Sequence, residues 1–219
     1  MKLNRYIDHT NLKPSATAQD IRTLCGEAAA YHFASVCVSP IWVDTAVKAL
    51  QGTDVNVCTV IGFPSGAHTT ATKAFEAADA VRRGCQEVDM VLSVGALLAG
   101  DTAYVYDDIR AVVEAAAGRC VKVILETGLL TDEQIVTATE LACRAGASFV
   151  KTCTGFSVGK ATVEHVRLMR RHVTDGVKVK ASGGIRTYED ALALIQAGAD
   201  RLGTSAGVAI MQGLLQKGE

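Results

Sequence analysis

Two lysines in apolar, strand-like segments are the residues best suited to do chemistry. Lys151 lies in the segment Phe149–Gly155 and Lys180 in the segment Val177–Gly184, and a glycine-bearing turn follows each of them. Burial and a second nearby ammonium both disfavour the charged form of a lysine. The neutral amine is the form that attacks a carbonyl to give a Schiff base. The pair therefore points to covalent chemistry on a carbonyl substrate.

The segments that must position these lysines alternate between strand-like and helix-like patterns. Eight apolar segments predict strands: Tyr6–His9, Ser35–Val38, Val55–Gly62, Glu87–Ser93, Val121–Glu126, Phe149–Thr152, Val177–Ala181 and Arg201–Gly203. Eight longer segments predict helices: Thr17–Tyr31, Pro40–Leu50, Thr69–Arg83, Thr102–Ala117, Thr131–Ala145, Gly159–His172, Tyr188–Ala197 and Ala206–Lys217. This α/β pattern favours one (β/α)8 TIM barrel, a single catalytic domain over residues 1–219. A doubly wound sheet is the alternative, although it usually needs fewer strands and no GxGxxG follows the first strand.

Side-chain alternation along each strand predicts which residues face the barrel interior. In Val121–Glu126 the two valines and Leu125 should meet the helices, which leaves the other face for the interior. The same phase in all strands points these residues inward: Cys37, Asp89, Lys122, Glu126, Lys151 and Lys180. Barrel enzymes place their chemistry at the C-terminal ends of the strands, so we expect these groups to converge there.

Each of these residues also has a purely structural interpretation. A Lys–Asp pair can be a buried ion pair that only fixes the barrel, although burying an excess amine without a use is costly. Cys37 can be a packing thiol, and His9 can be a structural hydrogen-bonding residue. Lys178 shares the face of Lys180 one layer deeper, so we expect it near the N-terminal mouth or paired with an acid.

Three glycine turns after neighbouring strands suggest an anion site. Gly155, the run Ser182–Gly184 and the run Gly203–Ser205 can each present backbone N–H groups. Barrels often bind phosphate with their last loops and a helix N-terminus. The structural alternative is that each glycine only supplies a positive φ for a tight turn.

The composition limits the possible partners and location. The net charge of -1 argues against a broad basic surface for nucleic acid. No apolar run reaches the roughly 18 residues that span a bilayer, and Met1–Tyr6 lacks the apolar core of a signal peptide. Seven cysteines without a CxxC motif indicate reduced thiols. We therefore expect a cytoplasmic protein that binds neither a membrane nor a nucleic acid. The sequence contains no HxH or HExxH motif, so we expect no metal site.

Several stretches together resemble the deoxyribose-phosphate aldolases, a class I aldolase family. The stretches are Ile7–Thr10, Leu12–Pro14, Gly62–Gly66, Glu87–Val91, Lys122–Thr127, Phe149–Thr152 and Lys180–Thr187. The resemblance implies that Lys151 forms the Schiff base, that Lys180 tunes it and that Asp89 is the acid/base. It also implies a set of substrate contacts: Cys37, Gly155, Gly183, Gly184 and Ser205. Cys153 departs from the family, which commonly has serine there, and its alternation places it on the Lys151 face.

The same resemblance implies an activity. It is the reversible cleavage of 2-deoxy-D-ribose 5-phosphate to D-glyceraldehyde 3-phosphate and acetaldehyde, without a cofactor or metal. Such a lyase serves deoxyribonucleotide catabolism and carbohydrate degradation, and we expect a homo-oligomer, either dimer or tetramer. Two alternatives remain: another Schiff-base TIM-barrel aldolase with a different sugar phosphate, and a non-catalytic phosphosugar-binding barrel.

Overall fold

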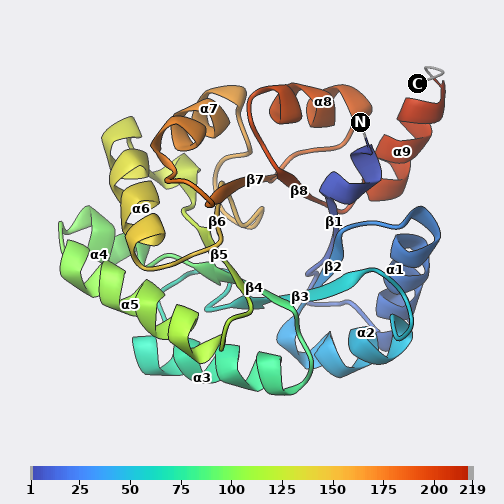
Figure 1. Ribbon diagram of the computed structural model, residues 1–219, viewed down its shortest axis with the longest axis horizontal. Coiled ribbons are helices and arrows are strands. Elements are labelled where there is room, and N and C mark those ends of the chain that lie inside the picture. Colours follow the sequence, from blue (N-terminus) through green and yellow to red (C-terminus); the bar gives the residue numbers. More distant parts are fainter. Residues whose placement is uncertain (1, 217–219) are drawn as a thin grey trace.

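Eight parallel strands close into a barrel in the computed structural model, which describes residues 2–216 (Figure 1). The strands are β1 (Ile7–Asn11), β2 (Ser35–Val38), β3 (Asn56–Ile61), β4 (Glu87–Val91), β5 (Cys120–Ile124), β6 (Phe149–Lys151), β7 (Lys178–Ser182) and β8 (Arg201–Thr204). Each strand pairs with the next in the sequence, and β8 pairs with β1 to complete the barrel. The predicted TIM barrel is confirmed.

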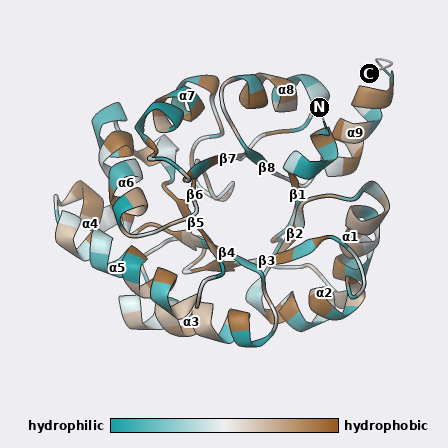
Figure 2. Cartoon of the chain, in the orientation of Figure 1, coloured by the Kyte–Doolittle hydropathy of each residue, from teal (hydrophilic) through white to brown (hydrophobic). Residues whose placement is uncertain are grey.

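Helices surround the strands as an outer ring (Figure 1). They are α1 (Ala18–Tyr31), α2 (Val43–Ala49), α3 (Thr70–Arg82), α4 (Val94–Leu98), α5 (Thr102–Ala115), α6 (Asp132–Arg144), α7 (Val163–His172), α8 (Tyr188–Gln196) and α9 (Gly207–Gln216). Short 3-10 turns lie at Leu3–Tyr6, Pro40–Trp42 and Thr127–Leu129. Figure 2 shows hydrophilic and hydrophobic residues mixed on these helices, as a ring with one face on the strands and one in solvent requires. Within residues 2–216, no helix has both the length and the apolar character that a bilayer crossing needs.

Local sequence signals explain where the helices begin and end. Thr17, Thr131 and Thr187 each form a capping box, in which the threonine side chain and the third helical residue satisfy each other's backbone N–H groups. Gly146 (φ 91°) and Gly198 (φ 112°) follow α6 and α8 in the left-handed region that glycine tolerates. These signals set where the helices begin and end between successive strands.

The main core lies between the strands and the helices. Valines from the outward faces of the strands supply much of it, including Val36, Val88, Val123 and Val179, all fully buried. A smaller cluster of Leu12, Cys37, Cys58 and Val60 lies apart from this core. The outer core holds the barrel rigid, so side chains on its inner face keep fixed positions.

A buried ion pair joins α3, α5 and the end of β4. Lys73 Nζ donates to Asp108 Oδ2 at 2.6 Å, to Ser93 Oγ at 2.9 Å and to the carbonyl of Val91 at 3.0 Å. Neither charged side chain is exposed. The pair fixes the chain where it leaves β4.

The structure differs from the predicted elements mainly after β4 and β6. The five-residue helix α4 was not predicted, because it is too short for a helical period to show. The predicted helix at Gly159–His172 begins only at Val163, because Thr162 caps it and Gly159 adopts a φ of 102°. The last predicted helix extends to Lys217, which lies outside the described residues.

Candidate active site

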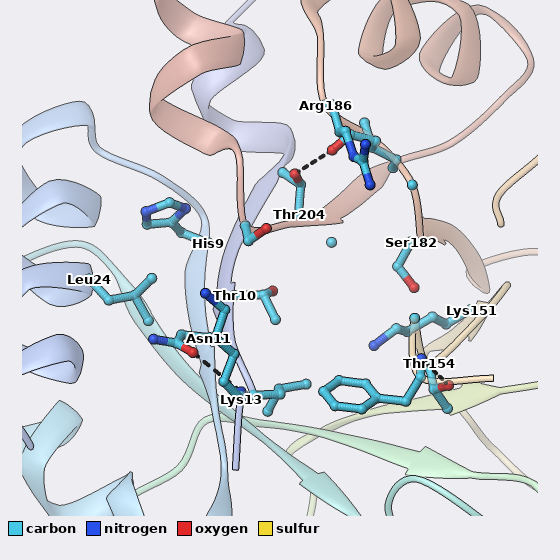
Figure 3. Close-up of a pocket in the computed structure, with 18 of the residues that line it drawn as sticks. His9, Thr10, Asn11, Lys13, Leu24, Lys151, Thr154, Ser182, Arg186 and Thr204 are labelled. Carbon is cyan, nitrogen blue, oxygen red and sulfur yellow. Dashed lines mark hydrogen bonds between the residues drawn. The ribbon is translucent and has the colours of Figure 1, made fainter. Parts of the chain in front are cut away.

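A cavity of about 570 Å³ opens at the C-terminal ends of the strands (Figure 3). Its walls come from the segments that follow β1, β6, β7 and β8, together with residues of α1. The Lys151 amine points into it from β6, and Ser182 and Thr204 face it from β7 and β8 (Figure 3). This is the end of the barrel at which we expected the chemistry.

Asp89 holds the two lysines singled out in the sequence. The Nζ atoms of Lys151 and Lys180 both lie 2.8 Å from the same oxygen, Asp89 Oδ2. The two nitrogens are therefore no further apart than twice that distance. Lys180 and Asp89 are fully buried, whereas Lys151 reaches the cavity. Of the two amines, Lys151 is thus the one that a ligand in the cavity can touch.

A second layer of charges lies beneath this trio, and the sequence interpretation gave it no catalytic role. Lys122 Nζ contacts Asp89 Oδ1 at 2.9 Å and Glu87 Oε2 at 2.5 Å. Asp8 Oδ2 lies 2.5 Å from Lys180 Nζ. Arg201 completes the layer by pairing with both Asp8 and Glu87. The strand alternation that predicted an inward Asp89 also places Glu87, two residues earlier, on the same face. Asp8 and Arg201 were not predicted to face the interior, because the sequence of their strands gave no such indication.

The interior cluster contains four cations and three anions. The cations are Lys122, Lys151, Lys180 and Arg201, and the anions are Asp8, Glu87 and Asp89. Among the ion pairs of the described residues, Lys151 has one carboxylate partner, whereas each other cation of the cluster has two. Lys151 is therefore the cation least held by carboxylates.

Burial and charge act in opposite directions on the other members. Burial alone would raise the pKa of Asp89, but Lys122, Lys151 and Lys180 outweigh it and hold the pKa well below its ordinary range. Burial alone would lower the pKa of Lys180, yet Asp8 and Asp89 outweigh it and raise the pKa above its ordinary value. Lys180 is therefore an ammonium beside Lys151, and Asp89 is a carboxylate in the resting site.

The predicted anion-binding turns line the same cavity. Gly155 (φ 81°), Gly183 (φ 98°) and Gly184 (φ 76°) all adopt left-handed conformations. Ser205 lines the cavity two residues before α9 begins at Gly207. A hydrogen bond of 2.8 Å from Thr204 Oγ1 to the carbonyl of Ile185 ties the turn after β8 to the turn after β7 (Figure 3). The positive φ values agree with the interpretation that these glycines serve tight turns. The position of all three turns on one cavity is also what an anion site requires.

Arg186 and Glu126 also shape this side of the cavity. Arg186 follows the double-glycine turn, and Figure 3 shows its side chain at the cavity, a cation that the sequence interpretation did not assign. Glu126 was expected to face the barrel interior, but β5 ends at Ile124 and Glu126 adopts a φ of 58°. Its carboxylate accepts from Thr154 Oγ1 at 2.5 Å and from the Thr154 N–H. It therefore fixes the turn that follows Lys151.

The remaining predicted residues lie outside the cavity wall. Cys37 is fully buried beside Cys58, and Leu12, which does line the cavity, packs against them. Cys153 was expected on the Lys151 face, but β6 ends at Lys151, so the alternation stops there and the Cys153 sulfur contacts Thr127 Oγ1 at 3.5 Å instead. Lys178 is exposed at the start of β7, with its Nζ 5.9 Å from the centre of the Phe149 ring.

Comparison with known proteins places this site in a family. The model of the DeoC/LacD family aldolases matches residues 3–213. A deoxyribose-phosphate aldolase of Streptococcus sanguinis (strain SK36) is 62% identical over 213 residues, 97% of each chain. Another, of Streptococcus pneumoniae (strain Taiwan19F-14), is 58% identical over 219 residues, the whole of both chains.

A solved structure agrees with these sequences. The structure described as a unique tetrameric structure of deoxyribose phosphate aldolase from Aeropyrum pernix has a TM-score of 0.91 and 34% identity, over 98% of this chain and 92% of that one. The family match covers most of the chain, and the match to the curated relatives is close to full length. The chain belongs to the DeoC/LacD family of aldolases.

Proposed function

We propose that the protein cleaves 2-deoxy-D-ribose 5-phosphate reversibly to D-glyceraldehyde 3-phosphate and acetaldehyde, with Lys151 as the Schiff-base lysine. The observation that carries the assignment is the position of Lys151. Its amine is at the cavity, 2.8 Å from Asp89, and belongs to a cluster with one surplus positive charge. The names of the curated relatives support the substrate.

The covalent step begins when the surplus proton leaves Lys151 for solvent in the cavity. The neutral amine attacks the C1 aldehyde carbon, and loss of water gives a protonated imine. The bond between C2 and C3 then breaks, and its electron pair moves toward the imine nitrogen. Lys180 keeps a positive charge near this nitrogen throughout.

Asp89 has the proton-transfer role in this proposal. Once the Lys151 nitrogen has become an imine, it holds Asp89 Oδ2 less strongly than the ammonium did. That oxygen then accepts the proton of the C3 hydroxyl through a water, while Lys180 still contacts it. Glyceraldehyde 3-phosphate leaves, and an enamine of acetaldehyde remains on Lys151. Protonation of the enamine carbon and hydrolysis of the imine release acetaldehyde and restore the amine.

The phosphate would sit against the turns at Gly155, Gly183–Gly184 and Ser205. Left-handed glycines allow backbone N–H groups to approach an anion closely, and the N-terminus of α9 adds a favourable dipole. Arg186 supplies a positive charge on the same side.

Borohydride reduction in the presence of substrate tests the assignment. We expect mass spectrometry to map one stable adduct to Lys151, and Lys151→Arg to abolish both the adduct and turnover, because the covalent step itself is removed. Lys13→Arg is the matched control, since Lys13 is a second lysine at the cavity and should leave the Lys151 adduct in place. An adduct on Lys180 or Lys122 would reverse the roles. Product analysis with acetaldehyde as donor separates this activity from that of another Schiff-base aldolase.

We also propose a homo-oligomer, dimer or tetramer, in the cytoplasm. The tetrameric relative from Aeropyrum pernix supports assembly, and so do strongly exposed apolar side chains such as Ile41 and Phe75. The seven free cysteines support a reducing compartment. Light scattering of the purified protein should give a mass above that of one chain. Fractionation of cells should place the protein in the cytoplasmic fraction.

A further inference from the structure

Two cysteines lie side by side next to Asp89. Cys37 of β2 and Cys58 of β3 are direct partners in the register of these neighbouring strands. Their sulfurs and an Asp89 carboxylate oxygen all lie within 4.8 Å of one another. Both cysteines are free and fully buried. The proposed mechanism uses Asp89 but gives no task to Cys58.

The geometry of this pair is compatible with a disulfide. Adjacent strands run about 4.8 Å apart, which lies inside the roughly 4.4–6.8 Å between Cα atoms that disulfides require. Register partners also point to the same face of the sheet, so a rotation about each Cα–Cβ bond brings the sulfurs together.

A bound metal ion is the competing use of three such groups, and the local charge argues against it. Asp89 already contacts the ammonium groups of Lys122, Lys151 and Lys180. A divalent cation would have to enter a cluster that already carries a surplus positive charge. Joining the two thiols adds no charge.

We propose that Cys37 and Cys58 form a modification site, at which a small peroxide such as hydrogen peroxide joins them in a reversible disulfide that slows the reaction. This inference rests on the proposed role of Asp89. The Cys58 thiol proton is engaged with Asp89 Oδ1, and burial raises the pKa of Cys58. Cys37 is therefore the sulfur that attacks first.

The steps balance without another reactant. The Cys37 thiolate attacks one peroxide oxygen, the O–O bond breaks, and the leaving hydroxide takes the thiol proton as water. The resulting sulfenic acid is attacked by the sulfur of Cys58, which loses its proton as the S–S bond forms and a second water leaves. Peroxide is reduced by two electrons and the two thiols are oxidised by two. Leu12 belongs to the same buried cluster as the two cysteines and also lines the cavity, so it marks the side from which peroxide would approach.

The disulfide would act on catalysis through Asp89. The Cys58 thiol donates to Asp89 Oδ1 at 3.1 Å, and Lys122 Nζ lies 3.5 Å from the same sulfur. Oxidation removes this donor and draws the sulfur toward Cys37, which leaves the carboxylate held by the ammonium groups of Lys122, Lys151 and Lys180 alone. Loss of a hydrogen bond to a charged group predicts a fall in kcat of about tenfold.

The test compares activity with covalent mapping. The wild-type enzyme is treated with hydrogen peroxide, quenched, assayed, and assayed again after dithiothreitol. We expect kcat to fall about tenfold and to recover. Trypsin should release the peptide 23–48 joined to the peptide 49–73, since Lys48 separates the two cysteines, and fragment ions should place the link at Cys37 and Cys58 rather than at Cys25. Cys58→Ala should lose this reversible response relative to its own starting activity, whereas Cys143→Ala, changed on α6, should keep it.

Other outcomes would overturn the proposal. These are the absence of the linked peptide after treatment, activity that dithiothreitol fails to restore, or a Cys58→Ala enzyme that loses and regains activity like the wild type. Borohydride trapping on the reduced enzyme reports separately on Lys151, so a failed trap would count against the proposed function while the peptide map still decides the disulfide.

Discussion

Replacing Lys180 by leucine should shift the acidic limb of the kcat/KM profile to higher pH. The substitution removes one of the four interior cations, so the cluster is balanced with Lys151 still protonated. Because both amines contact Asp89 Oδ2 at 2.8 Å, the two charges are at most twice that distance apart. Their repulsion at that separation is about 3 kcal/mol at an effective dielectric constant of about 20. Since one pH unit corresponds to about 1.36 kcal/mol, we expect an upward shift of about 2 units.

The assay is the pH dependence of kcat/KM for 2-deoxyribose 5-phosphate, measured over the range in which circular dichroism shows a folded variant. Lys48→Leu is the matched control, because Lys48 is an exposed lysine of α2 far from the cluster in the sequence and at the opposite, N-terminal side of β3. Its profile should match the wild type. An acidic limb that stays in place in the Lys180 variant would refute the reasoning from the charge of Lys180.

Three further results are expected. Gly184→Val should raise KM for the phosphorylated sugar far more than for free deoxyribose, because a side chain there blocks backbone approach to the phosphate; equal losses would mean that the turn only shapes the barrel. Lys73→Met should lower the free energy of unfolding in urea by about 3–5 kcal/mol, since it leaves the buried Asp108 without its cation; a change within error would show that the remaining hydroxyl donors suffice. Glu87 and Asp89 have folded pKa values below their unfolded ones, so their stabilisation is present at neutral pH and is lost as the pH falls below about 4; acid unfolding followed by fluorescence should become shallower in Asp89→Asn.

The barrel and the meeting of Lys151, Lys180 and Asp89 follow from local patterns. Strand alternation has a period of two, and one apolar face fixes its phase, so each inward residue can be predicted from its own strand. The C-terminal ends of parallel strands then bring these residues to one end of the barrel. The glycine turns line the cavity because they too follow the C-terminal ends of parallel strands.

Contacts across the barrel could not be predicted in this way. Arg201 pairs with Asp8 and Glu87, which are far from it in the sequence, and a single strand does not tell which residues on the opposite wall it meets. The end of β6 at Lys151 also had no signal, so alternation was extended one residue pair too far and misplaced Cys153. Both errors arise where tertiary structure, rather than the local period, sets the geometry.

The interior cluster divides by sign along the chain. Its acids all come from strands of the first half of the barrel, β1 and β4, and its bases all come from the second half, β5 to β8. The acids are Asp8, Glu87 and Asp89; the bases are Lys122, Lys151, Lys180 and Arg201. Either half alone would gather like charges on its inner wall, and only the partner half neutralises them. During folding this favours closure of the complete ring over a persistent half-barrel, and two fragments divided between α5 and β5 should attract each other more strongly at low ionic strength.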